Sequence, residues 1–177
     1  MKQTMKGYTA FSRLLTVFIG LSAIAAIIWT LAINRPVEYT NESEKITVGH
    51  AAPDFEATDT SGRRVRLSDY KGKTVIINMW ASWCPVCVKE MPLLQKADQL
   101  SNHQVETVYV NVGESKGTVN GFLQEQKFTF PVIIDATGNV TGVYKVSALP
   151  TTFIIDPNGN IARVITGEVS EMDLLDR

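Results

Sequence analysis

Cysteine and histidine are scarce in this sequence, with two residues of each type among 177. A tetrahedral zinc site needs four ligands, and the histidines, His50 and His103, are remote from the cysteines in sequence. Basic residues are not in excess either, since the formal net charge is −1. We therefore expect no metal site and no nucleic-acid partner. The chain also lacks internal repeats and low-complexity tracts, which excludes a repeat protein.

Charged residues are absent from residues 14–33. At about 1.5 Å per residue, a helix over this stretch would span the roughly 30 Å of a bilayer core. The basic residues that precede it have no acidic neighbour, so the positive-inside rule places residues 1–13 in the cytoplasm. We expect a transmembrane signal-anchor at 14–33, a linker at 34–47 and one catalytic domain at 48–177 on the extracytoplasmic face of the cell membrane.

Two alternatives to a membrane anchor remain open from the sequence. Ala23-Ile24-Ala25 resembles the small-residue site at which a signal peptide is cleaved. Apolar residues continue from Ala26 to Ile33, however, and a mature soluble N-terminus would have little reason to keep them. The second alternative is a helix buried in a globular core, which the missing polar face argues against.

Apolar runs predict the order of elements in the rest of the chain. The central feature is a βαβ unit, with strands at 74–80 and 105–112 and a helix from Pro85 to about Leu100 between them. The other expected elements are a hairpin of strands 55–60 and 64–67, a helix around 119–123, a strand at 131–134, a hairpin of strands 152–155 and 161–165, and a last helix from about 170. This α/β order describes a mixed central sheet with helices on both faces, the thioredoxin arrangement.

The two cysteines, Cys84 and Cys87, follow the apolar strand 74–80 directly. A strand that ends in Cys-x-x-Cys and continues as a helix places both sulfurs on the first helical turn. Unpaired N–H groups and the helix dipole stabilise a thiolate there. Pro85 is a favourable first helical residue because its missing N–H would have been unpaired anyway. We predict that Cys84 attacks a client disulfide and that Cys87 resolves the mixed disulfide.

Two further residues near the pair are candidates for the chemistry. Glu90 follows Cys87 by three residues, so a helix would place it on the same side as the cysteines. We interpret it as a partly buried acid that exchanges a proton with Cys87, the alternative being a solvated surface carboxylate. Trp83 directly precedes Cys84 and is expected to shape an apolar contact surface.

Four segments make the sequence similar to the TlpA/ResA/CcmG group of membrane-anchored, thioredoxin-like thiol-disulfide oxidoreductases, and to its ResA-like members most of all. They are Gly49–Phe55, Trp83–Cys87 with Glu90, Val110–Ser115 and Leu149–Phe153. The resemblance implies a thioredoxin fold with a central insertion, a cis bond before Pro150, and Glu90 as the active-site acid. If that bond is cis, Leu149 and Thr151 would offer backbone groups opposite Cys84 to an extended client peptide.

The resemblance also implies a cellular role. In such proteins the pair reduces disulfides of client proteins outside the membrane, classically between the haem-binding cysteines of apocytochrome c, and a CcdA-type membrane protein supplies the electrons. Residues Pro85 and Val86 depart from the Glu-Pro that ResA-like proteins usually carry between the cysteines. That departure leaves the potential and the client open.

Other functions of the cysteine pair remain to be weighed. A disulfide oxidase or isomerase would look almost the same in sequence. A structural disulfide is disfavoured because so short a loop constrains the unfolded chain little, and a metal carrier would use the two thiolates as ligands. A peroxidase would need a Thr-x-x-Cys site, and Ala81 occupies the threonine position. We expect a dithiol-disulfide exchange enzyme that acts as a reductant and needs no cofactor, because Cys84 and Cys87 carry the electrons themselves.

Overall fold

The computed structural model describes residues 20–21, 24, 29–30, 46–101 and 103–175. The chain divides into two compact units, Met1–Ser43 and Glu44–Arg177, and the elements reported below belong to the second. Of the helices within the described residues, none is long and apolar enough to cross a membrane. Most of the predicted anchor and of the linker lies outside the described residues, so both stay predictions.

A five-stranded sheet forms the centre of the second unit, in the strand order β5-β4-β3-β6-β7. Its strands are β3 (Thr74–Trp80), β4 (Val105–Val112), β5 (Val132–Asp135), β6 (Thr151–Ile155) and β7 (Ile161–Thr166). β3, β4 and β5 are parallel, whereas β6 is antiparallel to both β3 and β7. The predicted mixed sheet is therefore confirmed, and β3 lies in its middle.

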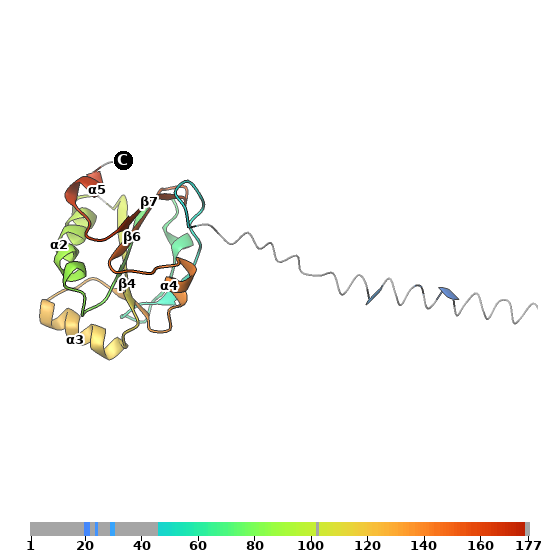
Figure 1. Ribbon diagram of the computed structural model, residues 1–177, viewed down its shortest axis with the longest axis horizontal. Helices are drawn as coiled ribbons and strands as arrows, with labels where there is room; N and C mark the ends of the chain where they lie inside the picture. Colours follow the sequence, from blue (N-terminus) through green and yellow to red (C-terminus); the bar gives the residue numbers. More distant parts are fainter. Residues whose placement is uncertain (1–19, 22–23, 25–28, 31–45, 102, 176–177) are drawn as a thin grey trace, which may run out of the picture. The chain divides into compact units, whose positions relative to one another are not determined.

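Helices and a small hairpin cover the two faces of this sheet (Figure 1). Their bounds are β1 (Glu56–Thr58), β2 (Arg64–Arg66), the 3-10 helix η1 (Leu67–Tyr70), α2 (Pro85–Leu100), α3 (Lys116–Gln126), α4 (Asn139–Val143) and α5 (Glu171–Leu175). One core cluster includes side chains of α2, α3 and α5, and the other includes side chains of β2, η1 and α4. The sheet is thus buried on both faces, as in a thioredoxin fold with α3 and β5 inserted between β4 and α4.

The sequence of the central strand β3 is almost continuously apolar because both faces of the strand are buried. Alternate side chains enter opposite cores, with Ile77 and Met79 in one cluster and Ile76 and Trp80 in the other. A strand covered on both sides has no solvent face, so an alternating polar pattern would be costly. Asn78 is the polar exception within this buried run, and it is fully buried.

Predicted and observed bounds agree for β3, α2 and β4, and the antiparallel β1–β2 hairpin is present with shorter strands. The helices η1 and α4 were not predicted. α4 is only five residues long, and its first turn is held by Asp135 of β5, whose carboxylate accepts hydrogen bonds from the backbone N–H groups of Val140 and Thr141. A helix that depends on a contact from another element has no local sequence signal.

Truncation of the central strand should destabilise the fold strongly. Ile77 has 0% exposure in β3, so Ile77→Ala removes buried methyl groups and leaves a cavity. We expect a loss of about 2–5 kcal/mol in the free energy of unfolding, measured by urea denaturation of the purified protein. Val164→Ala on β7, where the side chain is 37% exposed, is the control and should cost less than about 0.5 kcal/mol. Equal losses for the two variants would contradict the assigned core.

Candidate active site

The two cysteines form a disulfide at the start of α2, with an S–S distance of 2.02 Å and a Cα–Cα distance of 5.3 Å. Cys84 is the N-cap of the helix and Pro85 its first residue. The Cys84 Sγ accepts a hydrogen bond from the Cys87 backbone N–H at 3.3 Å. A sulfur in this position lies against unpaired N–H groups of the first turn, which favour a thiolate once the pair is reduced.

The two sulfurs differ in their access to solvent. Cys87 has 0% exposure and Cys84 7%, so Cys84 is less open than a freely exposed attacking thiol. Cys84 belongs to the buried cluster on the α2 side of the sheet, against which Leu149 also packs. Its neighbours Trp83 and Val86 are 68% and 42% exposed. The pair therefore lies just beneath an exposed apolar rim, and Cys84 is the sulfur nearer to solvent.

Glu90 is almost completely buried, at 2% exposure, which rules out the solvated surface carboxylate considered above. Its Oε1 accepts a hydrogen bond from Asn78 Nδ2 at 2.8 Å, and its Oε2 accepts one from the Val169 backbone N–H at 2.7 Å. Burial raises the pKa of Glu90 above its ordinary value of 4.5, and the negative charge of Glu168 adds to the rise, while the two hydrogen bonds oppose it. Its exchange of a proton with Cys87 stays a prediction.

Asn78 links the Glu90 carboxylate to the strand that follows the Pro150 loop. Its Nδ2 also donates to Thr152 Oγ1 in β6 at 3.0 Å. Val169, whose N–H is the other donor to Glu90, lies two residues after Gly167. The Gly167 N–H donates to the Pro150 carbonyl at 2.9 Å. Both hydrogen-bond partners of Glu90 thus lead to the segment around Pro150. The sequence singled out none of these contacts, because they join residues far apart along the chain.

The Leu149–Pro150 bond is cis, as the family resemblance implied. Pro150 and Thr151 are buried, and Thr151 Oγ1 donates to the Ala148 carbonyl at 2.8 Å, which fixes the turn before β6. Leu149 is partly buried and packs against both core clusters, one of which contains Cys84 and Cys87. The loop is therefore held in the neighbourhood of the pair. Binding of a client peptide by Leu149, Pro150 and Thr151 stays a prediction.

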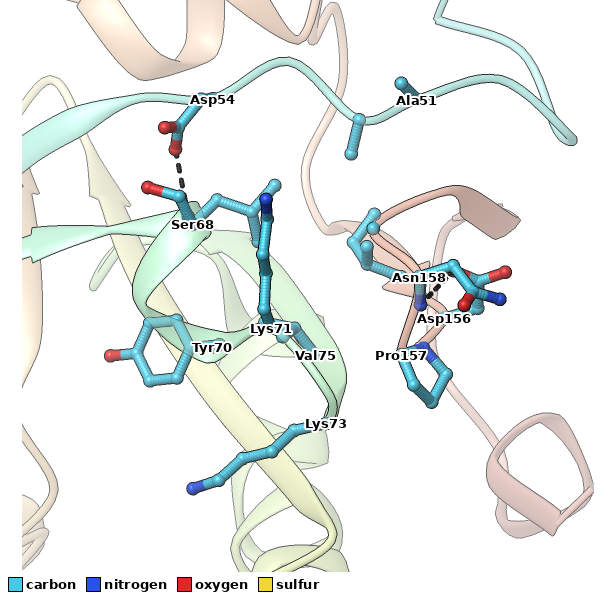
Figure 2. Close-up of a pocket in the computed structure, with 14 residues that line it drawn as sticks. Ala51, Asp54, Ser68, Tyr70, Lys71, Lys73, Val75, Asp156, Pro157 and Asn158 are labelled. Carbon is cyan, nitrogen blue, oxygen red and sulfur yellow. Dashed lines mark hydrogen bonds between the residues drawn. The ribbon is translucent and has the colours of Figure 1, made fainter.

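The cavity drawn in Figure 2 lies away from the cysteine pair. A cavity of about 300 Å³ opens between η1 and the turn at Pro157 and Asn158, with Val75 in its wall (Figure 2). Val75 is at the start of β3, so this cavity is roughly 15–20 Å from the cysteine end of the strand. Among the described residues, no group of three or more His, Cys, Asp or Glu side chains could hold a metal ion. The expectation that the enzyme needs no metal stays a prediction.

Comparison with known proteins supplies the family. The model of the AhpC/TSA family matches residues 48–164. The chain belongs to this family. A "Thiol-disulfide oxidoreductase ResA" of Geobacillus kaustophilus is 41% identical over 155 residues, which are 87% of each chain, and the protein of that name from Bacillus subtilis is 44% identical over 129 residues, 72% of each chain.

Solved structures agree with this assignment. A putative thiol:disulfide interchange protein DsbE from Chlorobium tepidum superposes with a TM-score of 0.66 at 31% identity, covering 72% of this chain and 90% of that chain. The recognition made from sequence motifs is thus confirmed. Together with the Cys84–Cys87 disulfide, these relatives show that the protein is a dithiol-disulfide oxidoreductase with a thioredoxin-like fold.

The buried Glu90 should make stability depend on pH in a defined direction. A carboxyl whose pKa is raised in the folded protein stabilises the fold at pH values below the unfolded pKa, and this contribution is lost as pH rises through the folded pKa. The Glu90→Gln variant lacks this titration. We expect the stability of the variant relative to the wild type to increase as pH rises from about 4 to 8, measured by urea unfolding of the oxidised proteins. A constant difference across that range would show that Glu90 does not titrate with a raised pKa.

Proposed function

We propose that this protein is an extracytoplasmic reductant that reduces disulfides in client proteins, with the haem-binding cysteines of apocytochrome c as the principal client. Electrons would reach its Cys84–Cys87 disulfide from a CcdA-type membrane protein. The observation that carries the proposal is the buried carboxylate of Glu90, which α2 places one turn beyond Cys87. The 20 uncharged residues at 14–33 support a membrane anchor that places the catalytic domain on the extracytoplasmic face.

The difference in exposure between Cys84 and Cys87 supports the predicted order of their reactions. In the reduced protein the Cys84 thiolate attacks a client sulfur, the client disulfide breaks, and one client cysteine leaves as a thiolate. Cys87, with 0% exposure, is shielded from outside disulfides and close enough to attack Cys84 Sγ. That second attack releases the other client cysteine and leaves the protein oxidised, the state of the present structure. The two electrons thus pass from the pair to the client.

Glu90 is suited to accept a proton from Cys87 and to favour electron transfer toward the client. Cys87 must lose a proton before it attacks, and a carboxyl with a raised pKa can accept that proton near neutral pH better than an ordinary one. When ionised, the same carboxylate is a buried negative charge that disfavours a second anion at the pair. A dithiol that gains little from thiolate formation favours the disulfide, which makes the pair a stronger reductant.

The surface around Cys84 is suited to a polypeptide rather than to a small molecule. Trp83, Pro85 and Val86, which flank Cys84 in the chain, are exposed. The Leu149–Thr151 segment, with its cis peptide bond, would present backbone groups to an extended client chain. Client contacts would then combine apolar packing with backbone hydrogen bonds, and neither depends strongly on the client sequence beside its cysteines.

An oxidising role is the second candidate. The dipeptide between the cysteines is Pro85-Val86, whereas ResA-like proteins usually carry Glu-Pro there, and this departure favours the oxidising role. A structural relative at 30% identity and a TM-score of 0.62 is described as a putative protein disulfide isomerase from Bacteroides thetaiotaomicron. An oxidase would pass its disulfide to reduced clients. The direction of exchange therefore has to be measured in cells.

Trapping in cells tests the client directly. In Cys87→Ser the mixed disulfide on Cys84 cannot be resolved, so it should accumulate and be isolated with the client still attached. We expect an apocytochrome with a Cys-x-x-Cys-His site among the trapped proteins, identified by mass spectrometry after non-reducing purification. Cys84→Ser is the matched control and should trap far less because Cys87 is buried. Recovery of unrelated exported proteins alone would contradict the reductive assignment and favour the oxidase.

A further inference from the structure

A second carboxylate, Glu114, holds the turn that leads from β3 to the cysteines. Its Oε1 accepts a hydrogen bond from the Ser82 hydroxyl at 2.6 Å, and its Oε2 accepts one from the Ser82 backbone N–H at 2.7 Å. The Asn111 Nδ2 donates to the same Oε2 at 2.7 Å. Ser82 lies two residues before Cys84 in the chain. Both hydrogen-bond donors of Ser82, the residue that enters the redox turn, are therefore bound by one side chain.

The backbone that carries Glu114 is itself fixed on both sides. Gly113 has a φ of 76°, a conformation that side chains rarely adopt, and its N–H donates to the Asp135 carbonyl at 3.1 Å. Ser115 is the N-cap of α3 and its Oγ accepts from the Thr118 N–H at 3.2 Å. A carboxylate anchored between a capped helix and a constrained glycine has little freedom to follow movements of Ser82. Glu114 is thus the rigid partner of the contact.

Glu114 is also a permanent charge. Partial burial would raise its pKa, but the hydrogen bonds from Asn111 and Ser82 outweigh burial and hold the pKa below the ordinary value of 4.5. The group is therefore ionised at neutral pH. None of its three partners is cationic, so no opposite charge at those contacts neutralises it.

We infer that Glu114 is a positioning residue that holds the Ala81–Cys84 turn at the start of α2 and, as a fixed negative charge, makes the Cys84–Cys87 pair a stronger reductant. The electrostatic part follows from the opposing effect of the helix. The first turn of α2 stabilises a Cys84 thiolate, whereas a nearby anion destabilises it. Destabilising the thiolate favours the disulfide over the dithiol, and so favours electron donation.

The charges around the pair come from several elements. Glu90 of α2 is buried beyond Cys87, and Lys89 of α2 is paired with Glu168 at 2.8 Å. Glu114 lies in the segment between β4 and α3, and it contacts the redox turn at Ser82. Two carboxylates from different elements are therefore connected to the segment that carries the pair, and Lys89, next to Glu90 in the helix, is already engaged in an ion pair. The inference rests on the proposed reductive function, to which it adds a second residue that sets the direction of exchange.

Two substitutions separate the charge of Glu114 from its structural contact. Glu114→Gln removes the charge but keeps the size of the side chain. Its carbonyl oxygen can keep the contacts of Oε2 with the Ser82 backbone N–H and Asn111 Nδ2, and its amide nitrogen can donate to the Ser82 hydroxyl oxygen in place of Oε1. Glu114→Asp keeps the charge but shortens the reach to Ser82. Ser82→Ala keeps the charge and removes only the hydroxyl contact.

The titration of the Cys84 thiol is measured in the reduced full-length protein, from the rate of alkylation by iodoacetamide between pH 4 and pH 10. The redox equilibrium of the Cys84–Cys87 pair is measured against glutathione. In Glu114→Gln we expect the Cys84 titration to move about half a pH unit lower. The equilibrium with glutathione should shift about threefold toward the dithiol, which corresponds to about 15 mV. Glu114→Asp and Ser82→Ala should stay closer to the wild-type pH profile and equilibrium even where they lower stability.

The outcomes distinguish this inference from the proposed function. An unchanged or higher Cys84 titration in Glu114→Gln would overturn the electrostatic role. Equal shifts in Glu114→Asp and Glu114→Gln would overturn it as well, by reducing Glu114 to a structural contact. By contrast, a wild-type protein that exchanges normally with glutathione but donates no electrons to clients would count against the reductive function and not against the effect of Glu114 on the thiol.

Discussion

Burial of one carboxylate beside a dithiol is the constraint around which the site is built. Removing Glu90 from water is unfavourable, and the fold accepts it because Asn78 and the Val169 backbone each donate a hydrogen bond to it. Those donors come from β3 and from the segment after β7, so the acid joins α2 to two other parts of the sheet region. The same two donors lead on to Thr152 and Gly167, next to the Pro150 loop. A proton held on Glu90 is therefore structurally close to both the sulfur chemistry and the expected peptide site.

The sheet explains why this arrangement can be rigid. β3 is covered on both faces and delivers the Ala81–Cys84 turn from its buried end, while Glu114 holds that turn from the neighbouring β4 side. A reactive sulfur at a helix N-terminus needs its helix and its preceding strand to be fixed, because a small displacement alters the N–H groups that stabilise the thiolate. The carboxylates of Glu90 and Glu114 disfavour the thiolate that the helix N-terminus stabilises. The balance between these effects determines the reduction potential of the pair.

Local sequence patterns predicted the features that local physics controls. The unbroken apolar runs located β3 and β4, Pro85 marked the start of α2, and Cys-x-x-Cys located the pair. The features that were missed depend on contacts between distant residues: α4 rests on Asp135, and Glu90 rests on Asn78 and Val169. The burial of Glu90 was only half predicted, since helical spacing put it on the cysteine side but could not show what covered it. The cis bond before Pro150 came from family resemblance alone, because most X-Pro bonds are trans.

The reduction potential of the wild-type Cys84–Cys87 pair tests the central claim most directly. It is measured by equilibrating the purified protein with dithiothreitol and glutathione buffers and quantifying the free thiols. The account predicts a potential at or below that of thioredoxin, about −270 mV, because buried and fixed carboxylates disfavour the thiolate. A potential near that of the oxidant DsbA, about −120 mV, would contradict it and assign the pair to disulfide formation.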